Sequence, residues 1–241
     1  NISTRGLDPH RSWELNVRQD GVMVNSDIYG YPASHYSLPL EAVDRIEYVR
    51  GTAALQYGAQ FGGLINYVTR APDSTRPARV WASTTGGSNG LIATFGSVGG
   101  KVGNVTYYGY ASLRRSDGYR ENSTSDYDAE YLAVSAPIGR EWTFRGQLGR
   151  SFYRYQIPGP LTDAMFEANP RASTRSRNWF SPEIYVPAIT GEWRPDDRTR
   201  LVTQVSGVFG ERSSVQFVGL ATTPDVPDES GELAPRQGDI D

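Results

Sequence analysis

Two groups of side chains in this sequence have the chemistry to bind an anionic ligand. The first is a loop at 25–37 that carries tyrosines and a histidine, and the second is a loop at 154–178 that carries arginines. Arginine offers a planar fork of donors that matches a carboxylate, and tyrosine rings suit flat organic groups. The alternative interpretation is a solvated arginine-rich loop and tyrosines at a membrane interface. The candidate ligand-binding residues are Tyr29, Tyr31, His35, Tyr36, Gln60, Arg171, Arg175 and Arg177.

No group of residues in the sequence is typical of an enzyme. Cysteine is absent, which excludes disulfides, thiolate chemistry and cysteine-ligated metals. The two histidines, His10 and His35, cannot form a zinc site alone, and no catalytic triad or phosphate-binding loop stands in a supporting context. Asp126, Asp128 and Glu130 fit a calcium site, but a strand that begins in a polar loop explains them equally well. The net charge of −3 argues against a nucleic-acid partner.

Residues 1–70 are predicted to form a compact, β-rich α/β unit. Asp20-Gly21 joins two short apolar segments, and this pair supplies the positive φ values of a type I′ hairpin turn. Residues 44–50 alternate between two faces and residues 64–69 are mostly apolar, so each segment predicts a strand. Ser37 is placed to cap a short helix.

Beyond a linker at 71–77, the sequence changes to long strands with strict alternation. In one of them Trp142 and Phe144 share one face, while Arg145 and Gln147 share the other. Alternation over about ten residues matches a tilted membrane strand, whereas strands of soluble sandwiches usually have about 5–6 residues. Short turns alternate with long polar loops, as in an outer-membrane barrel. Seven strands are expected, near 78–86, 89–98, 102–115, 126–137, 141–154, 179–193 and 198–210.

The composition also indicates strands that meet an interface rather than membrane-spanning helices. Hydrophobic residues make up 38% of the chain, and no run of about 18 apolar residues is present. Aromatic residues make up 12%, and 15 of them are tyrosines. We expect Trp81, Tyr107, Trp142 and Phe144 to face lipid or to lie in an aromatic girdle.

One stretch of the chain carries a family resemblance. Asp44-Arg-Ile-Glu-Tyr-Val-Arg-Gly51, Tyr57-Gly58 and Gly62-Gly-Leu-Ile-Asn66 follow one another, with Arg5-Gly6 and Gln19-Asp-Gly21 before them. In order and spacing these segments resemble the end of the plug domain of TonB-dependent outer-membrane receptors. Asp44 departs slightly from the family pattern, which often has Glu at this position. The loop patterns Tyr29-Gly-Tyr-Pro32 and Pro158-Gly-Pro-Leu-Thr-Asp-Ala-Met-Phe166 look most like ferric dicitrate-type receptors.

The resemblance implies a mainly β fold in two parts. Residues 1–72 would be the C-terminal part of an α/β plug domain, and residues 73–241 the N-terminal part of a transmembrane antiparallel β-barrel. The full protein would have about 22 strands, the size of plugged outer-membrane transporters. This chain would then be a fragment, with a TonB box before Asn1. The implied location is the outer membrane of a Gram-negative bacterium, whose lipid surrounds the barrel.

The resemblance also implies a function in active transport rather than catalysis. Such a receptor would bind an anionic iron chelate, ferric citrate or a siderophore, with energy from the TonB complex of the inner membrane. No cofactor is expected, and iron enters only as part of the bound chelate. The alternative is a capture receptor for oligosaccharide or another nutrient, in a surface glycan-uptake or adhesion system. Its loops would be expected to carry tryptophan and asparagine rather than arginine.

Further residues receive roles from the same resemblance. Arg5, Glu47 and Arg50 match charges of the family's plug, whose arginines face glutamates on the barrel wall and lock the plug in place. Alternatively, Arg50 merely ends a strand and contacts Glu47 or solvent. A second set is expected to shape turns and close packing rather than to touch ligand. This set comprises Gly21, Gly51, Gly58, Gly62, Gly63 and Asn66.

Overall fold

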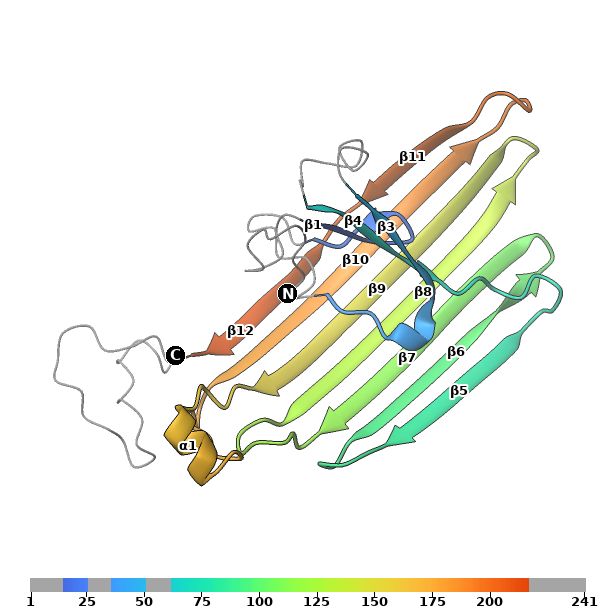
Figure 1. The fold of residues 1–241 in the computed structure, drawn as a ribbon. Helices are drawn as coiled ribbons and strands as arrows, with labels where there is room; N and C mark the ends of the chain where they lie inside the picture. Colours follow the sequence, from blue (N-terminus) through green and yellow to red (C-terminus); the bar gives the residue numbers. More distant parts are fainter. Residues whose placement is uncertain (1–14, 26–35, 51–61, 217–241) are drawn as a thin grey trace.

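The computed structural model of the chain describes residues 15–25, 36–50 and 62–216, whose strands form two sheets (Figure 1). One sheet has the strand order β2-β1-β4-β3, and the other has the order β11-β10-β9-β8-β7-β6-β5, with β12 also paired to β10. Within these residues, no helix is long and apolar enough to cross a membrane. The chain is therefore mainly β, as the sequence predicts, and the larger sheet is not closed in this chain.

The four-stranded sheet contains β1 (Leu15–Gln19), β2 (Val22–Met23), β3 (Val43–Val49) and β4 (Gly63–Thr69). The predicted hairpin is confirmed, because β1 and β2 are antiparallel and join at Asp20 (φ 50°) and Gly21 (φ 80°). These are the two positive φ values that a type I′ turn requires. Strand β4 then pairs parallel to β1 and antiparallel to β3. Residues 51–61 precede β4 and lie outside the described residues.

The predicted cap at Ser37 is wrong. The short helix is a 3₁₀ turn, η2 (Leu40–Ala42), whose N-cap is Pro39, and no side chain caps it. The backbone N–H of Ser37 instead donates to Ser151 Oγ of the larger sheet, at 3.3 Å. Contact with the larger sheet takes precedence over the local cap at this position.

The larger sheet is an antiparallel meander of long strands. The seven predicted strands are present, but the last is interrupted at 207–208 and continues to Val215, where a loop was expected. Both of its pieces pair with β10. The strands are β5 (Arg79–Gly86), β6 (Ile92–Val102), β7 (Val105–Ser116), β8 (Ser125–Ile138), β9 (Trp142–Gln156), β10 (Trp179–Trp193), β11 (Leu201–Ser206) and β12 (Phe209–Val215).

Long and short connections lie at opposite ends of this sheet. The long loop between β9 and β10 contains the helix α1 (Asp163–Ala168), which Thr162 caps by accepting from the backbone N–H of Met165. Figure 1 shows this loop, the β7–β8 loop and the shorter β5–β6 connection at one end of the strands, and the β6–β7, β8–β9 and β10–β11 turns at the other. The alternation of loop lengths predicted from the sequence is confirmed.

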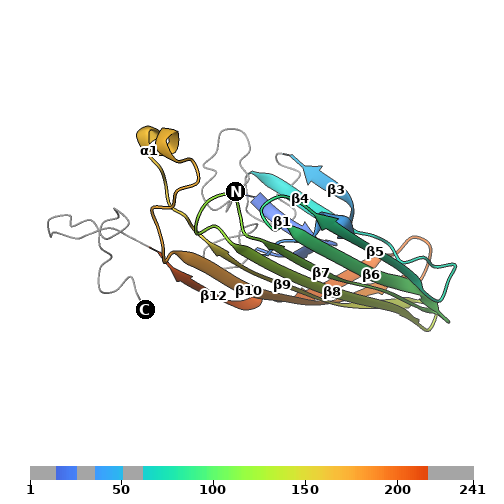
Figure 2. The ribbon, with the colours of Figure 1, turned by 90° about the horizontal axis from the view of Figure 1, so that it is seen from below.

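The two faces of the larger sheet differ in what they meet. We call the face that contacts the four-stranded sheet the inner face (Figure 2). Leu132, Leu148 and Ile189 point from the opposite, outer face and are 49–64% exposed. The expectation for Trp81 is wrong, because its cross-strand partner Ser97 pairs in turn with Tyr110, which is buried on the inner face. Trp81 therefore lies on the inner face, where its ring is 5.3 Å from that of Phe95.

Two apolar clusters join the sheets. The first packs side chains of β1, β2 and Tyr36 against Ile184, Val186 and Ala188 of β10. The second has only Ala42 from the smaller sheet's side, set among Phe95 and residues of β7 and β8. The predicted division of the chain after residue 72 falls in the connection between β4 and β5 and stays a prediction.

Candidate functional site

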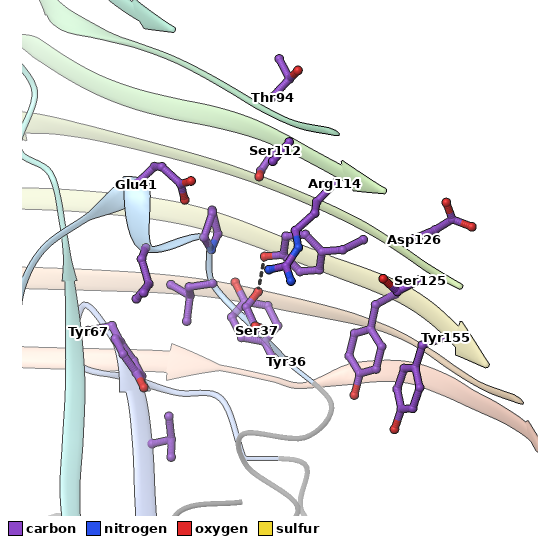
Figure 3. A pocket seen from close by; sticks show the side chains of 17 residues that line it. Tyr36, Ser37, Glu41, Tyr67, Thr94, Ser112, Arg114, Ser125, Asp126 and Tyr155 are labelled. Carbon is purple, nitrogen blue, oxygen red and sulfur yellow. Dashed lines mark hydrogen bonds between the residues drawn. The ribbon is translucent and has the colours of Figure 1, made fainter. Parts of the chain in front are cut away.

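A pocket of about 610 Å³ lies between the two sheets, toward the end with the long loops (Figure 3). The segment 36–41 forms one side, and inner-face side chains of β7, β8 and β9 form the other. We call it the loop-end pocket. Its volume falls within the range of small-molecule sites, about 300–1,000 Å³. Its polar groups are mostly hydroxyls, with one guanidinium, that of Arg114, and two carboxylates, those of Glu41 and Asp126. The Arg114 side chain extends toward Ser37 (Figure 3).

Five of the residues that line the loop-end pocket are tyrosines. Tyr127 donates from its hydroxyl to the carbonyl oxygen of Ser37 at 2.9 Å, which ties β8 to the pocket's other side. Tyr153 and Tyr155 of β9 stack with ring centroids 5.7 Å apart. Ser112 lies on β7 and is buried. Rings with hydroxyl tips can contact apolar groups and donate hydrogen bonds at the same time.

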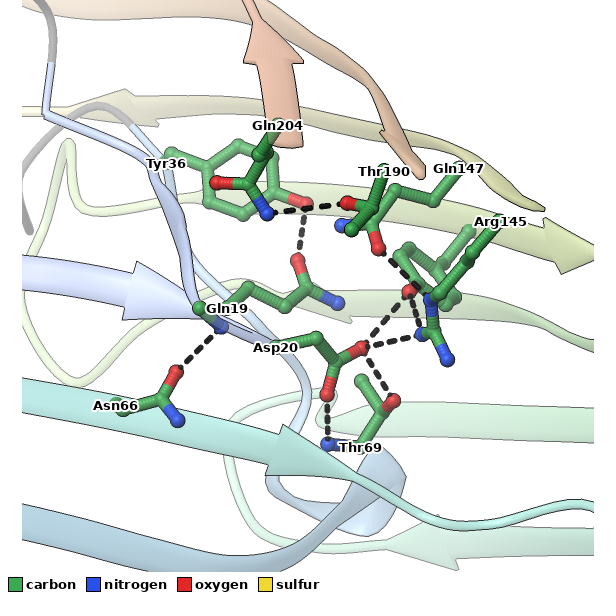
Figure 4. A network of polar contacts seen from close by, with 11 residues as sticks. Gln19, Asp20, Tyr36, Asn66, Thr69, Arg145, Gln147, Thr190 and Gln204 are labelled. Carbon is green, nitrogen blue, oxygen red and sulfur yellow. Dashed lines mark hydrogen bonds and ion pairs between the residues drawn. The ribbon is translucent and has the colours of Figure 1, made fainter. Parts of the chain in front are cut away.

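A polar network at the Asp20-Gly21 turn holds the two sheets together (Figure 4). Asp20 Oδ2 accepts from Tyr131 Oη at 2.8 Å, from Arg145 Nη2 at 3.0 Å and from Thr69 Oγ1 at 2.6 Å. Its Oδ1 accepts from the backbone N–H of Thr69 at 2.8 Å. The Asp20 side chain is only 11% exposed, so these donors replace water around the charge. We call these four residues the Asp20 network.

The long loops are joined to each other by a second arginine. Arg120 donates from its guanidinium to the carbonyl oxygens of Pro158, Gly159 and Ala172. The backbone N–H of Glu121 donates to the carbonyl oxygen of Arg171 at 2.8 Å. The β7–β8 and β9–β10 loops therefore form one connected layer at the end of the sheet.

The comparisons with known proteins agree on one family. The family model described as "TonB-dependent Receptor Plug Domain" matches residues 1–64. A vitamin B12 transporter, BtuB of Photobacterium profundum, is 37% identical over 93 residues, which are 38% of this chain and 15% of the relative. Among solved structures, unliganded ferric citrate transporter FecA matches with a TM-score of 0.74 and 25% identity, over 89% of this chain and 34% of that one.

By these matches, the chain is similar to TonB-dependent receptors in its plug part and in its fold. The siderophore receptor PiuA of Acinetobacter baumannii shares the fold, with a TM-score of 0.64 at 10% identity over 84% of this chain and 30% of that one. The chain thus spans about a third of the solved receptors and less of the curated relative. In family terms the four-stranded sheet belongs to the plug and the larger sheet to the barrel wall.

Of the predicted ligand-binding residues that the structure describes, one lies at the pocket. Tyr36 borders it, but the side chain is 3% exposed and its hydroxyl donates to Gln19 Oε1 at 2.7 Å. Burial raises the pKa of Tyr36 above its usual range. Tyr29, Tyr31, His35 and Gln60 lie outside the described residues.

The three predicted arginines lie in the β9–β10 loop rather than in the lining of the loop-end pocket. Arg171 lies over the ring of Tyr119, at 5.4 Å from its centroid. Arg175 is partly buried and donates to the carbonyl oxygen of Thr174, while Arg177 is exposed. Their loop stands above the same end of the sheet as the pocket, so a ligand that enters from the loops would pass them first.

Of the predicted lock residues, the two that the structure describes contact the plug itself. Glu47 accepts from Asn66 Nδ2 at 2.8 Å and from Arg45 Nη2 at 2.8 Å, and these bonds lower the pKa of the Glu47 carboxyl. Arg50 lies over the ring of Tyr48, 5.3 Å from its centroid. Arg5 lies outside the described residues, and a lock against other barrel strands stays a prediction.

The predicted turn residues lie in and beside the plug sheet. Asn66 Oδ1 accepts from the backbone N–H of Gly21 at 2.9 Å, which links β4 to the hairpin turn. Gly62 directly precedes β4. Gly63 has φ 116°, and a Cβ added there would lie 2.7 Å from the carbonyl oxygen of Val49. Gly51 and Gly58 lie outside the described residues.

Sequence reasoning missed the residues that do join the plug to the wall. Asp20 was read as a turn residue, and its hydrogen bonds to Tyr131 and Arg145 were not foreseen. A signal was present, because Arg145 alternates with Trp142 and Phe144 and so had to point away from lipid. An arginine on the inner face of a barrel strand is stabilised by a carboxylate partner, but no local pattern in the sequence identifies Asp20 as that partner.

Proposed function

We propose that this chain is part of a transport receptor that binds an anionic iron chelate, ferric citrate or a similar siderophore, at the Gram-negative outer membrane. Energy would come from the TonB complex, as in the family. The observation that carries the proposal is the loop-end pocket, where Arg114 stands among tyrosine and serine hydroxyls, with the carboxylates of Glu41 and Asp126 also in the lining. A guanidinium with hydroxyl donors suits a ligand with several carboxylates. Iron would be cargo, held by its chelator rather than by side chains of the receptor.

The loop above the pocket supports the same ligand class. It adds Arg171, Arg175 and Arg177 on the path from the loops, so the electrostatic potential there favours anions. The alternative, capture of an oligosaccharide or another nutrient, would be expected to place tryptophan and asparagine in the pocket. The described lining holds tyrosines and an arginine instead. Vitamin B12 is carried by a relative that matches only 38% of this chain, and it serves as a second test substrate.

Uptake of radioactive iron as ferric dicitrate by iron-limited cells tests the proposal. Deletion of the gene should abolish uptake, and Arg114→Gln should weaken binding about tenfold, the loss of roughly 1.4 kcal/mol of contact. Arg115→Gln is the matched control, because Arg115 is next in sequence but lies outside the pocket lining, where it pairs with Asp126 at 3.4 Å. Normal ferric citrate uptake after gene deletion would refute the proposed substrate, and lost cobalamin or oligosaccharide uptake would replace it.

A second variant tests the loop arginines. Replacement of Arg171, Arg175 and Arg177 by glutamine together should slow association of ferric dicitrate more than it speeds dissociation, because charges on the approach path act on encounter. The effect should shrink as salt is raised, since exposed charges are screened beyond about 10 Å at 0.1 M salt. An unchanged association rate in this triple variant would remove these residues from the ligand path.

A further inference from the structure

One arginine of the β7–β8 loop holds both parts of the β9–β10 loop. Arg120 donates from Nη1 to the carbonyl oxygen of Gly159 at 2.6 Å, and from Nε and Nη2 to that of Ala172 at 2.9 and 2.7 Å. Its Nη2 also donates to the carbonyl oxygen of Pro158, at 3.3 Å. Pro158 and Gly159 precede α1 in the sequence and Ala172 follows it, so a single side chain bridges the two limbs of this loop. We call these hydrogen bonds the Arg120 clamp.

The two limbs of the loop also pack directly on each other at the Arg120 clamp. The backbone N–H of Thr174, after α1, donates to the carbonyl oxygen of Pro158, before α1, at 2.9 Å. Gly159 has φ 73°, and a Cβ added there would collide with the side chains of Thr174 and Arg175. Glycine is the residue that fits between limbs this close, so the base of the loop is tightly packed where Arg120 meets it.

The next residues of the β7–β8 loop hold the backbone of two predicted ligand-binding arginines. The backbone N–H of Glu121 donates to the carbonyl oxygen of Arg171 at 2.8 Å. The side-chain amide of Asn122 donates to the carbonyl oxygen of Arg175. The β7–β8 loop therefore fixes the points from which the side chains of Arg171 and Arg175 leave the β9–β10 loop.

Arg120 is itself held in position by its own loop. Its backbone N–H donates to Ser123 Oγ at 3.1 Å, and the Ser123 hydroxyl donates to the carbonyl oxygen of Arg120. The residue is half-buried, and in the part of the chain that the structure describes its guanidinium meets carbonyl oxygens and no carboxylate. The positive charge is not neutralised by these acceptors, so an experiment has to separate the charge from the fork of donors.

We infer that Arg120 is a positioning residue, which fixes Arg171 and Arg175 before ligand arrives and joins the two long loops into one body. The inference rests on the proposed function, in which these arginines lie on the path of an anionic ligand. A mobile side chain or loop that becomes ordered on binding costs free energy, and a loop that is already ordered avoids this cost. Arg120 acts through the β9–β10 loop and not by contact with ligand.

Hydrogen exchange of the full receptor without ligand, followed by mass spectrometry, measures the clamp. Arg120→Lys keeps the charge, but one ammonium nitrogen cannot stand where Nη1 and Nε both stand. Exchange of the backbone amides of residues 171–175 should become about tenfold faster or more, because local opening of the loop becomes easier. Arg154→Lys is the matched control, because Arg154 lies at the same end of the sheet but over the ring of Trp179, 5.0 Å from its centroid. It should change this exchange less than about twofold.

A mutant cycle tests whether the clamp serves ligand binding. Arg120→Lys in the parent receptor should weaken equilibrium binding of ferric dicitrate about fivefold, because the loop must then be ordered when ligand binds. The same change in the triple glutamine variant of Arg171, Arg175 and Arg177 should weaken binding less than about twofold, since the side chains that the clamp positions are gone. An equal loss in both backgrounds would mean that Arg120 acts independently of these arginines, and would overturn the inference.

Unchanged exchange in Arg120→Lys, or faster exchange with unchanged affinity, would also overturn the inference. If Arg120→Lys does not assemble in the membrane, Asn122→Ala replaces it in both measurements, because it removes the hydrogen bond to the carbonyl oxygen of Arg175. Failure of the proposed function gives a different result. A parent receptor that does not bind ferric dicitrate, but whose loop exchange responds to Arg120→Lys, would refute the proposed substrate and keep the clamp.

Discussion

A single carboxylate, that of Asp20, connects three strands of two different sheets. It accepts from Thr69 of β4, Tyr131 of β8 and Arg145 of β9, and its own backbone turns the β1–β2 hairpin. If the Asp20 carboxylate were removed, all of these donors would lose their acceptor at once. Asp20 therefore matters more to plug attachment than its place in a surface turn suggests.

Asp20→Asn is expected to loosen the plug without disturbing the hairpin. Asparagine tolerates the positive φ of this turn, but its amide cannot accept from all four donors. Hydrogen bonds to a charged group contribute about 1.5–3 kcal/mol, so plug attachment should weaken by about that amount. Protease resistance of the plug in purified receptor measures it.

Asp196→Asn is the matched control for that variant. Asp196 also accepts from neighbouring backbone N–H groups, those of Arg198 and Thr199, but it lies in the β10–β11 turn away from the plug. Its replacement should leave plug protease resistance unchanged. Equal sensitivity of the two variants would mean that Asp20 acts only through local turn stability.

Tyr36 should make plug attachment sensitive to alkaline pH. Its pKa in the folded state is raised by burial above the usual value of 10.0, so the folded protein keeps a proton that the unfolded chain loses. The resulting stability is fully present below the unfolded pKa and is lost as the pH rises above about 10, by up to 1.4 kcal/mol per pH unit. Urea unfolding of the plug, followed at increasing pH, gives the slope.

Tyr36→Phe separates this ionisation from the rest. The variant loses the hydrogen bond to Gln19 at every pH, and this loss by itself lowers the stability curve without changing its slope. The variant also has no phenol proton to lose, so the fall of stability above about pH 10 should be shallower than in the parent protein. Parallel curves for the two proteins would show that Tyr36 is not the group responsible.

At the scale of elements, the β3–β4 pair depends on one glycine. Gly63 opens β4 with φ 116°, and a Cβ there would lie 2.7 Å from the carbonyl oxygen of Val49. Gly21, in the hairpin turn, has φ 80° with nothing within 4 Å of an added Cβ. Gly21→Ala should cost only the left-handed backbone term, about 1–2 kcal/mol. Gly63→Ala should cost clearly more, because backbone atoms must also move.

Thermal unfolding of the two alanine variants gives this comparison directly. A larger loss of stability in Gly63→Ala than in Gly21→Ala supports close approach as the reason for glycine at Gly63. Equal losses would mean that glycine is required at both positions only for its backbone conformation.

The strands were predictable because their signals are local. Alternation over 142–148 and the Asp20-Gly21 turn each depend on neighbouring residues, and the structure confirms both. The parallel pairing of β1 with β4 joins segments far apart in the sequence, and the sequence contains no local signal for it. The break at 207–208 was missed for a related reason, since it is visible only through the pairing of both pieces with β10.

The candidate site was less predictable than the fold. The arginine loop lies at the same end of the sheet as the candidate pocket, but the lining of the pocket depends on which face of each strand meets the plug. Alternation along the strand predicts that Arg114 and Leu113 lie on opposite faces. Only the packed structure shows that the face with Arg114 meets Ser37. The prediction that Trp81 faces lipid was wrong because an aromatic residue in a short strand can pack equally well against lipid or against the plug.

At the scale of the whole molecule, the outer face is arranged in bands. Near the short turns, Trp142 stacks with Phe144 and Trp193, as an aromatic girdle would. Near the long loops, Arg150 pairs with Glu130 at 2.8 Å and with Glu183 at 2.7 Å. Between these bands the outward residues are apolar. This order indicates how the sheet would lie in a membrane, with its charged band at the loop side.

Leu148→Arg tests that placement. In a bilayer, an arginine near the midplane on the lipid face should destabilise the folded barrel by about 2–4 kcal/mol. The control is Phe166→Arg on α1, because Phe166 is 58% exposed and Leu148 49%, so both would be harmless surface changes in a protein surrounded by water. Reversible unfolding of the receptor in lipid vesicles measures both. Only Leu148→Arg should lower stability, and equal values would mean that the apolar band of β9 does not face lipid.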